Sequence, residues 1–153
     1  MSHAERRFAD MLSEFTPDIA AQGAEAVAWL RARLPTATVM VYDSYNALAV
    51  GFAPNMRPSD AIVSLAVLPR WITLCFIKDG PRLPDPEGLL RGGGSRVRHV
   101  RLTGGPADLE TPAIQALLDA ALGMADPPMP DGPPGAFLIK SVSPRRRPRR
   151  PAG

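Results

Sequence analysis

Apolar and polar positions alternate most clearly in the middle third of the chain, between Val39 and Ile77. Several runs there are typical of strands, because apolar residues occupy every second position or fill the run almost completely. Short connectors separate them, and Pro69-Arg70 is short enough to reverse the chain directly into an antiparallel partner. With two later runs, the pattern predicts strands at residues 38–42, 47–53, 62–67, 71–77 and 97–102, and a short edge strand at 136–142.

Apolar residues recur at helical spacing on both sides of this region. Residues 8–15 predict a short amphipathic helix. Thr16-Pro17 and Thr111-Pro112 each combine a good N-cap residue with a good first helical residue, so longer helices are predicted over 17–34 and 112–123. We therefore predict an α+β fold, with an antiparallel sheet of five to six strands covered by two N-terminal helices and one C-terminal helix.

The central strands are apolar at both odd and even positions. Leu65 and Cys75 share one parity, and Ala66 and Leu74 share the other. If residues of one parity share a face, both faces of the sheet need cover. The helices could supply it internally, but so could a second subunit in a homodimer or an apolar ligand in a cavity.

The positive charge of the chain is concentrated in its last residues. The formal net charge is +3, but Arg145, Arg146, Arg147, Arg149 and Arg150 alone exceed it, so the rest of the chain is slightly acidic. Proline is frequent there too. We predict a single domain over residues 1–143 and a disordered Arg/Pro-rich tail over 144–153, whose arginines make weak, non-specific contact with polyanions.

The cysteine content and the apolar segments suggest a location. The single cysteine, Cys75, lies in an apolar run, which favours a buried, reduced thiol. The first residues do not resemble a signal peptide, and no stretch is long and apolar enough to span a membrane. We expect a cytoplasmic protein without membrane contact.

The motifs exclude several kinds of chemistry. His3, His99 and Cys75 do not have the spacing of a zinc site, so no metal is predicted. The run Gly92-Gly93-Gly94 lacks the pattern of a phosphate-binding loop and precedes a strand instead of a helix. Gly93-Gly94-Ser95 also lacks the closing glycine of a hydrolase nucleophile elbow. The sequence predicts no cofactor and no catalytic residue.

Six residues are candidates for ligand binding, with His99 foremost because histidine transfers protons near neutral pH. Trp71 with Tyr42 and Tyr45 could line a pocket, and Arg57 with Asp60 could close its rim. Arg98 lies beside the glycine run. Trp71 could equally be a core residue, and Asp60 could simply cap its loop. The candidates are Tyr42, Tyr45, Arg57, Trp71, Arg98 and His99.

Several segments of the chain, in order, resemble the YdhG-like family, a widespread bacterial domain of unknown function. They are Val41–Leu48, Gly51-Phe52 with Pro54, Ser59–Ile62, Pro69-Arg70-Trp71, Leu83–Pro86, the glycine run before Arg98-His99, and Lys140–Ser143 with the arginines that follow. The resemblance covers about residues 16–150. It implies a frataxin-like fold, and some members have been called iron chaperones.

The function expected from the sequence is non-catalytic binding of a small molecule or a protein. The first alternative is iron binding and delivery, as the resemblance implies; the first helix offers Glu5, Asp10 and Glu14 as carboxylates. The second alternative is an enzyme of unknown reaction that uses His99 with Arg98 or Asp43.

Overall fold

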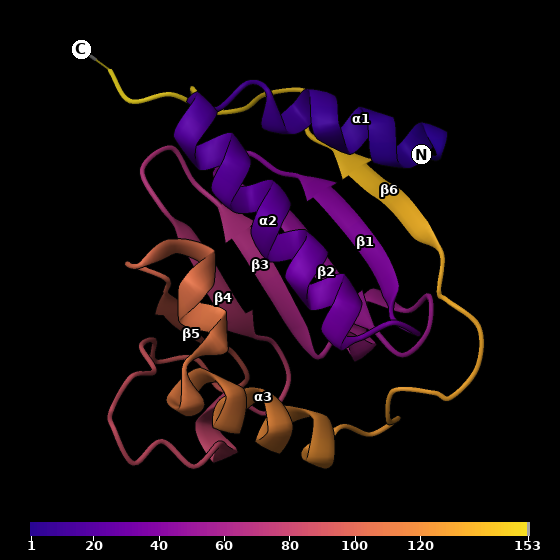
Figure 1. The fold of residues 1–153 in the computed structure, drawn as a ribbon, viewed down its shortest axis with the longest axis vertical. Coiled ribbons are helices and arrows are strands. Elements are labelled where there is room, and N and C mark those ends of the chain that lie inside the picture. The colour runs from indigo at the N-terminus through magenta and orange to yellow at the C-terminus, as the bar shows by residue number, and fades with distance from the viewer. Residues whose placement is uncertain (153) are drawn as a thin grey trace.

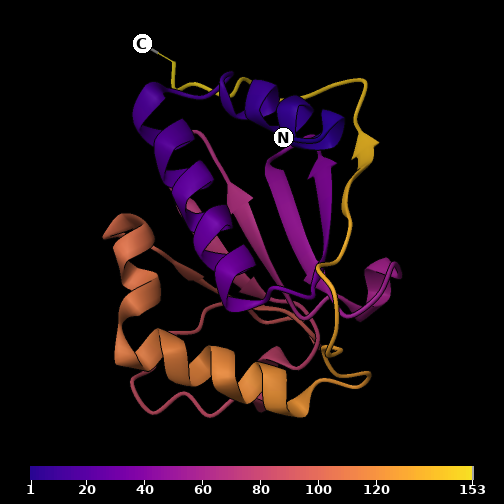
Figure 2. The same cartoon turned by 45° about the vertical axis from the view of Figure 1, so that its right-hand side comes forward.

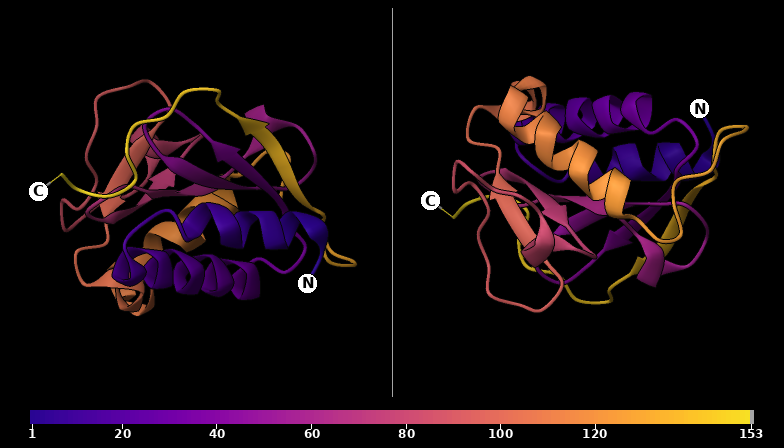
Figure 3. Two further views of the ribbon diagram at one scale, coloured as in Figure 1. Left: turned by 90° about the horizontal axis from the view of Figure 1, so that it is seen from above. Right: turned by 90° about the horizontal axis from the view of Figure 1, so that it is seen from below.

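The computed structural model describes residues 1–152 and places three α-helices on one face of a six-stranded sheet (Figures 1 and 3). The α+β prediction is confirmed at this level. Gly153, the end of the predicted tail, lies outside the described residues. The elements are α1 (His3–Leu12), α2 (Pro17–Arg33), β1 (Thr38–Asp43), β2 (Leu48–Ala53), β3 (Val63–Val67), β4 (Ile72–Phe76), β5 (Arg98–Arg101), α3 (Pro112–Met124) and β6 (Phe137–Val142).

The sheet is mixed, and the prediction of an antiparallel sheet was wrong in one strand. The strand order is β5-β4-β3-β2-β1-β6, and every neighbouring pair is antiparallel except β1 with β6, which run parallel. After α3 the chain crosses back along the molecule through residues 125–136, so it enters β6 at the end where β1 begins (Figures 1 and 2). Such a crossover makes two strands parallel.

The prediction that both faces of the sheet need cover was wrong for β3 and β4, while a small cluster of Met40, Ala53 and Ala61 is buried on the other face. The turn at Pro69-Arg70 is closed by a hydrogen bond from the Leu68 amide to the Trp71 carbonyl (3.0 Å), and Leu65 therefore pairs with Leu74. In such a two-residue hairpin, paired residues have opposite number parity. The large apolar residues of β3 and β4 consequently share one face, which the helices cover, while Ser64, Ala66, Thr73 and Cys75 share the other.

α2 and α3 begin where the sequence predicts, whereas α1 begins at His3, five residues before the predicted start. Ser2 and Glu5 form a capping box at the start of α1, and the Thr16 hydroxyl accepts a hydrogen bond from the Ile19 amide (3.4 Å) at the start of α2. Within α2, Gly23 allows close packing, because a Cβ atom there would lie 2.9 Å from Cδ2 of Leu12 and 3.2 Å from Cγ2 of Val67. α2 thus lies directly on the middle of the sheet (Figure 1).

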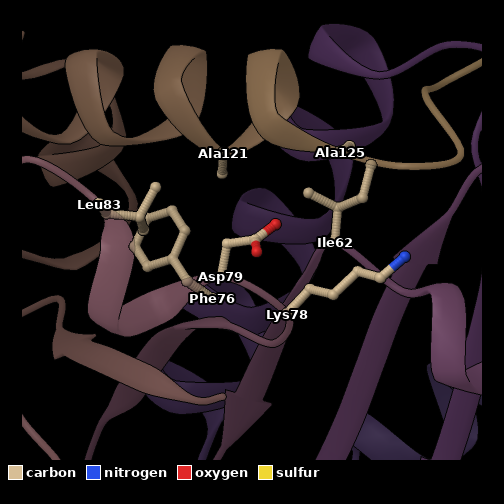
Figure 4. A pocket seen from close by; sticks show the side chains of 7 residues that line it. All are labelled: Ile62, Phe76, Lys78, Asp79, Leu83, Ala121 and Ala125. Carbon is tan, nitrogen blue, oxygen red and sulfur yellow. The ribbon is translucent and has the colours of Figure 1, made fainter. Parts of the chain in front are cut away.

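The core lies between the helices and the covered face of the sheet, and it is tightly filled. Beneath α3, Ile62, Phe76 and Leu83 meet Ala121 and Ala125, with Lys78 and Asp79 at the edge (Figure 4). These side chains leave about 0 Å³ for a water-sized molecule. The core beneath α3 therefore has no room for a ligand.

Candidate functional site

A broad groove crosses one end of the uncovered face of the sheet. Its volume is about 590 Å³, and it brings together two residues predicted for ligand binding, Trp71 and His99. β3, β4, β5 and the loops beside them supply its lining. The residues are Ala66, Leu68, Trp71, Thr73, Arg91, His99, Arg101 and Thr103.

Small side chains form the floor on which this groove opens. Ala49 pairs with Ala66, and Gly51 with Ser64, so the middle strands of the uncovered face carry little side-chain bulk. Larger residues stand at the two sides: Tyr42 on β1, and Trp71 before β4. Of these small residues, only Ala66 lines the groove, and beside Gly51 a small apolar cluster of Met40, Ala53 and Ala61 is buried with Tyr42 and Ile77.

Trp71 holds the main cation of the groove in place. The guanidinium carbon of Arg101 lies 3.6 Å from the centroid of the Trp71 ring. Such a stacked cation–π contact stabilises by about 0.5–1 kcal/mol at an exposed site. Because stacking restricts the guanidinium to one plane, its N–H donors are already oriented for a carboxylate or phosphate oxygen.

A second arginine reaches the groove through an isolated bridge. The amides and carbonyls of Arg91 and His99 exchange two hydrogen bonds (2.8 and 2.9 Å), which place Arg91 beside the outer edge of β5. Gly92, with φ of +114°, turns the chain between them, in a conformation that other residues rarely adopt. The predicted irregular glycine run thus returns the chain to the strand that carries His99, with Arg91 at the groove.

The thiol nearest to His99 is not activated. Cys75 and His99 are directly paired across β4 and β5 and share the uncovered face. Burial raises the pKa of the Cys75 thiol, and a hydrogen bond with Ser64 offsets this only in part. A nucleophilic cysteine needs the opposite shift. Since no Asp or Glu within residues 1–152 lines the groove, His99 also lacks a carboxylate to orient it.

The structure separates the other predicted ligand-binding residues from this groove. Tyr42 lies on the same face but on β1, four strands from His99, and burial raises the pKa of its phenol. Arg98 pairs with Phe76 and donates to the carbonyl of Gly94 (2.5 Å), on the other side of β5 from His99. An enzyme that uses His99 with Arg98 therefore finds no support.

Tyr45 and Arg57 lie in other parts of the molecule. Tyr45 is exposed, with the guanidinium of Arg147 5.8 Å from its ring centroid. Arg57 does pair with Asp60 (3.7 Å), as predicted, but Asp60 accepts hydrogen bonds from Asn55 (3.0 Å) and Lys78 (3.4 Å), and these contacts lower its pKa. Their role is to fix the loop between β2 and β3.

The carboxylates of the first helix do not form a metal site. Glu5 forms an ion pair with Arg31 (3.2 Å), whose hydrogen bond lowers the pKa of Glu5, and Glu14 binds Arg146 (2.8 Å). Over residues 1–152, no three His, Cys, Asp or Glu side chains come close enough to hold a metal ion. The geometry gives no support to iron delivery.

Residues 145–150 of the C-terminal tail, for which the sequence predicts disorder, contact Asp43, Tyr45 and Glu14 (Figure 1). Asp43, at the end of β1, is 2% exposed and accepts hydrogen bonds from Arg146 and from Arg149 (2.6 Å each). Arg149 is itself only 6% exposed and lies over the ring of Phe15. The buried carboxylate is the physical reason for these contacts, because an unpaired charge at Asp43 would be strongly destabilising.

The remaining tail arginines lie at the surface. Arg150 donates to the carbonyls of Glu14 (3.1 Å) and Ser13 (3.4 Å), just beyond the end of α1. The amide of Arg147 donates to the Tyr45 carbonyl (2.9 Å), and Arg145 is exposed. An enzyme that uses His99 with Asp43 finds no support either. Asp43 is paired with Arg146 and Arg149 of the tail and lies four strands from His99.

Three polar residues that line the groove are not among the candidates from the sequence. They are Arg91, Arg101 and Thr103. A signal for Arg91 existed, because a glycine run between two arginine-containing segments is typical of a tight chain reversal. The stacking of Arg101 on Trp71 had no signal, because these residues are 30 positions apart.

Comparison with known proteins adds no further constraint. No protein-family model matches the chain, and no curated protein or solved structure is significantly similar to it. None of the helices in the described chain has both the length and the apolar character needed to cross a membrane.

Proposed function

We propose that this chain is a non-catalytic binding domain that holds a small organic anion in the groove on the uncovered face of the sheet. The observation that carries the proposal is the arginine stacked on the groove's tryptophan, Arg101 on Trp71 at 3.6 Å. A surface that fixes a cation in one plane, with no carboxylate lining the groove in the described chain to neutralise it, favours a negatively charged ligand.

The apolar lining determines the rest of the ligand. Ala66, Leu68 and the Trp71 ring offer apolar surface next to the two arginines, and Thr73 and Thr103 add hydroxyl groups. Pockets for small molecules combine an apolar lining with a few polar groups that fix orientation. The ligand is thus an organic acid with an apolar body, whose carboxylate or phosphate group contacts Arg101.

The proposal excludes a reaction at this site. Catalysis through His99 needs a nucleophile or a carboxylate partner, while its cross-strand neighbour Cys75 has a raised thiol pKa. Membership of the YdhG-like family, the frataxin-like form of the fold, a homodimer and a cytoplasmic location remain predictions from the sequence. They do not alter the chemistry of the groove.

Tryptophan fluorescence gives a direct test, because the chain has two tryptophans and only Trp71 lines the groove. In a Trp29→Phe variant, Trp71 is the sole reporter. We expect benzoate to change its emission in a saturable way, and benzyl alcohol, which has the same ring without the charge, to do so much less.

A pair of arginine variants supplies the control. Arg101→Gln removes the cation from the groove, so benzoate should bind about tenfold more weakly. Arg70→Gln changes an exposed arginine in the turn before β4 and should leave the affinity within about twofold. Equal binding of benzoate and benzyl alcohol, or equal affinity in both variants, would contradict the proposal.

A further inference from the structure

A second pocket, of about 440 Å³, lies where the C-terminal tail meets the end of α1. It is remote from the groove and shares no residue with it. Most of its lining is arginine. The residues are Glu14, Pro144, Arg146, Arg147, Pro148, Arg149 and Arg150.

Positive charge is in excess at this pocket. The four arginines of its lining face two carboxylates, Asp43 and Glu14, so two positive charges remain uncompensated there. Both carboxylates already accept hydrogen bonds from Arg146, and the hydrogen bonds that Arg146 donates to Glu14 raise the pKa of Arg146. Two arginines sharing one buried carboxylate repel each other, and a bound anion would relieve this repulsion.

Hydrogen-bond donors are also in excess. The side chain of Arg149 is only 4% exposed. Its Nε and Nη1 atoms are buried and have no hydrogen-bond partner in the described part of the chain. Buried donors normally have a partner, and leaving one unpaired costs about 1–3 kcal/mol. Arg147 contributes a full guanidinium group whose contact is the ring of Tyr45, at 5.8 Å.

The chain holds these donors in position. The Arg147 backbone is fixed by its hydrogen bond to Tyr45, Pro148 restricts the next residue, and Arg150 is anchored to carbonyls at the end of α1. Ordered guanidinium groups match the oxygens of phosphate better than a flexible basic segment does. The docked tail therefore differs from the non-specific polyanion contact expected of a disordered one.

We propose that this arginine pocket binds a doubly charged oxyanion with the geometry of phosphate. Two uncompensated charges match a dianion. Its oxygens accept from Arg147 and Arg150 at the surface, and a small shift of Arg149 brings Nε and Nη1 within reach. A free phosphate ion and the phosphate ester of a small molecule present the same chemistry.

Calorimetric titration of the full chain tests the proposal, with inorganic phosphate and glycerol phosphate as the two probes. Chloride at the same ionic strength supplies the baseline. We expect saturable binding of at least one probe, which identifies the source. Arg147→Gln should weaken it about tenfold, since a lost charge-assisted contact corresponds to about 1.4 kcal/mol.

Two matched variants keep the result interpretable. Arg145→Gln removes the same charge from the same tail, but outside the pocket lining, and should change the affinity less than about twofold. Arg101→Gln, in the groove, should leave phosphate binding intact. Absence of heat beyond the chloride baseline, equal losses in Arg145→Gln and Arg147→Gln, or loss in Arg101→Gln alone would each overturn the proposal.

Discussion

The two faces of the sheet differ in both the size and the polarity of their side chains. On the covered face, Val50, Leu65 and Leu74 are fully buried under the helices. On the uncovered face, their neighbours along the strands include Gly51, Ser64 and Ala66, beside Thr73 and Cys75. A sheet can leave one face open to water when that face exposes little apolar surface. Ala66 and Thr73 of the uncovered face line the groove, so stability and the proposed binding use opposite faces.

The largest loss of stability should come from removing the buried charge of Asp43, on the covered side of the sheet. Asp43→Asn leaves Arg146 and Arg149 without their carboxylate, and breaking a buried pair of this kind costs about 4 kcal/mol. Urea unfolding measures the loss. Asp119→Asn is the control, because its pair with Arg33 is exposed, and it should cost less than about 1 kcal/mol. Similar losses in both would show that the tail is not docked as described.

Neighbouring residues on β3 compare the faces directly. Leu65→Ala removes a fully buried side chain beneath α2 and should lower the free energy of unfolding by about 3 kcal/mol. Ser64→Ala, one position earlier and on the uncovered face, should change it by no more than about 0.5 kcal/mol. Comparable losses in the two variants would contradict the one-sided arrangement.

Adding a methyl group at Gly51, on the uncovered face, should have a small effect of the opposite sign on the free energy of unfolding. A Cβ atom at Gly51 would meet its nearest neighbour, the Met40 carbonyl oxygen, at 3.8 Å, which is ordinary contact. Gly51→Ala should raise the free energy of unfolding by about 0.5 kcal/mol, because alanine loses less backbone entropy on folding. A lower urea midpoint would show that the backbone there depends on glycine.

The smallest perturbation concerns reactivity instead of stability. Because burial raises the pKa of Cys75, a smaller fraction of its thiol is ionised at any given pH than in the unfolded chain. A thiol-reactive chromophore at pH 8 should therefore label the native protein more slowly than the same protein in urea. Equal rates would mean that the uncovered face is more accessible than the structure indicates.

Local patterns predicted most of the elements but not how two of them are joined. The threonine-proline pairs located the starts of α2 and α3, and the apolar runs located the strands. Numerical parity failed at Pro69-Arg70, because it ignores how a two-residue turn shifts the register. The direction of β6 had no local signal either, since it depends on the path through residues 125–136.

The candidate site was predicted only in part, because local patterns do not show which distant residues meet. Trp71 and His99 were identified by residue type, and the structure brings them together. Tyr45 and Arg98 were chosen by sequence proximity, which does not show on which side of a strand a residue lies. The contact between the tail and Asp43 could not be predicted, because composition alone does not reveal a buried acceptor more than a hundred positions away.

The parallel edge strand has a consequence for how this molecule folds. β6 pairs residues 137–142 with residues 39–43, so nearly the whole chain must be gathered before that ladder can form. Contacts of such long range form slowly, because the entropy of closing the loop is lost first. Until then β1 has a bare edge, open to pairing with another molecule, and agents that delay β6 should favour aggregation during refolding.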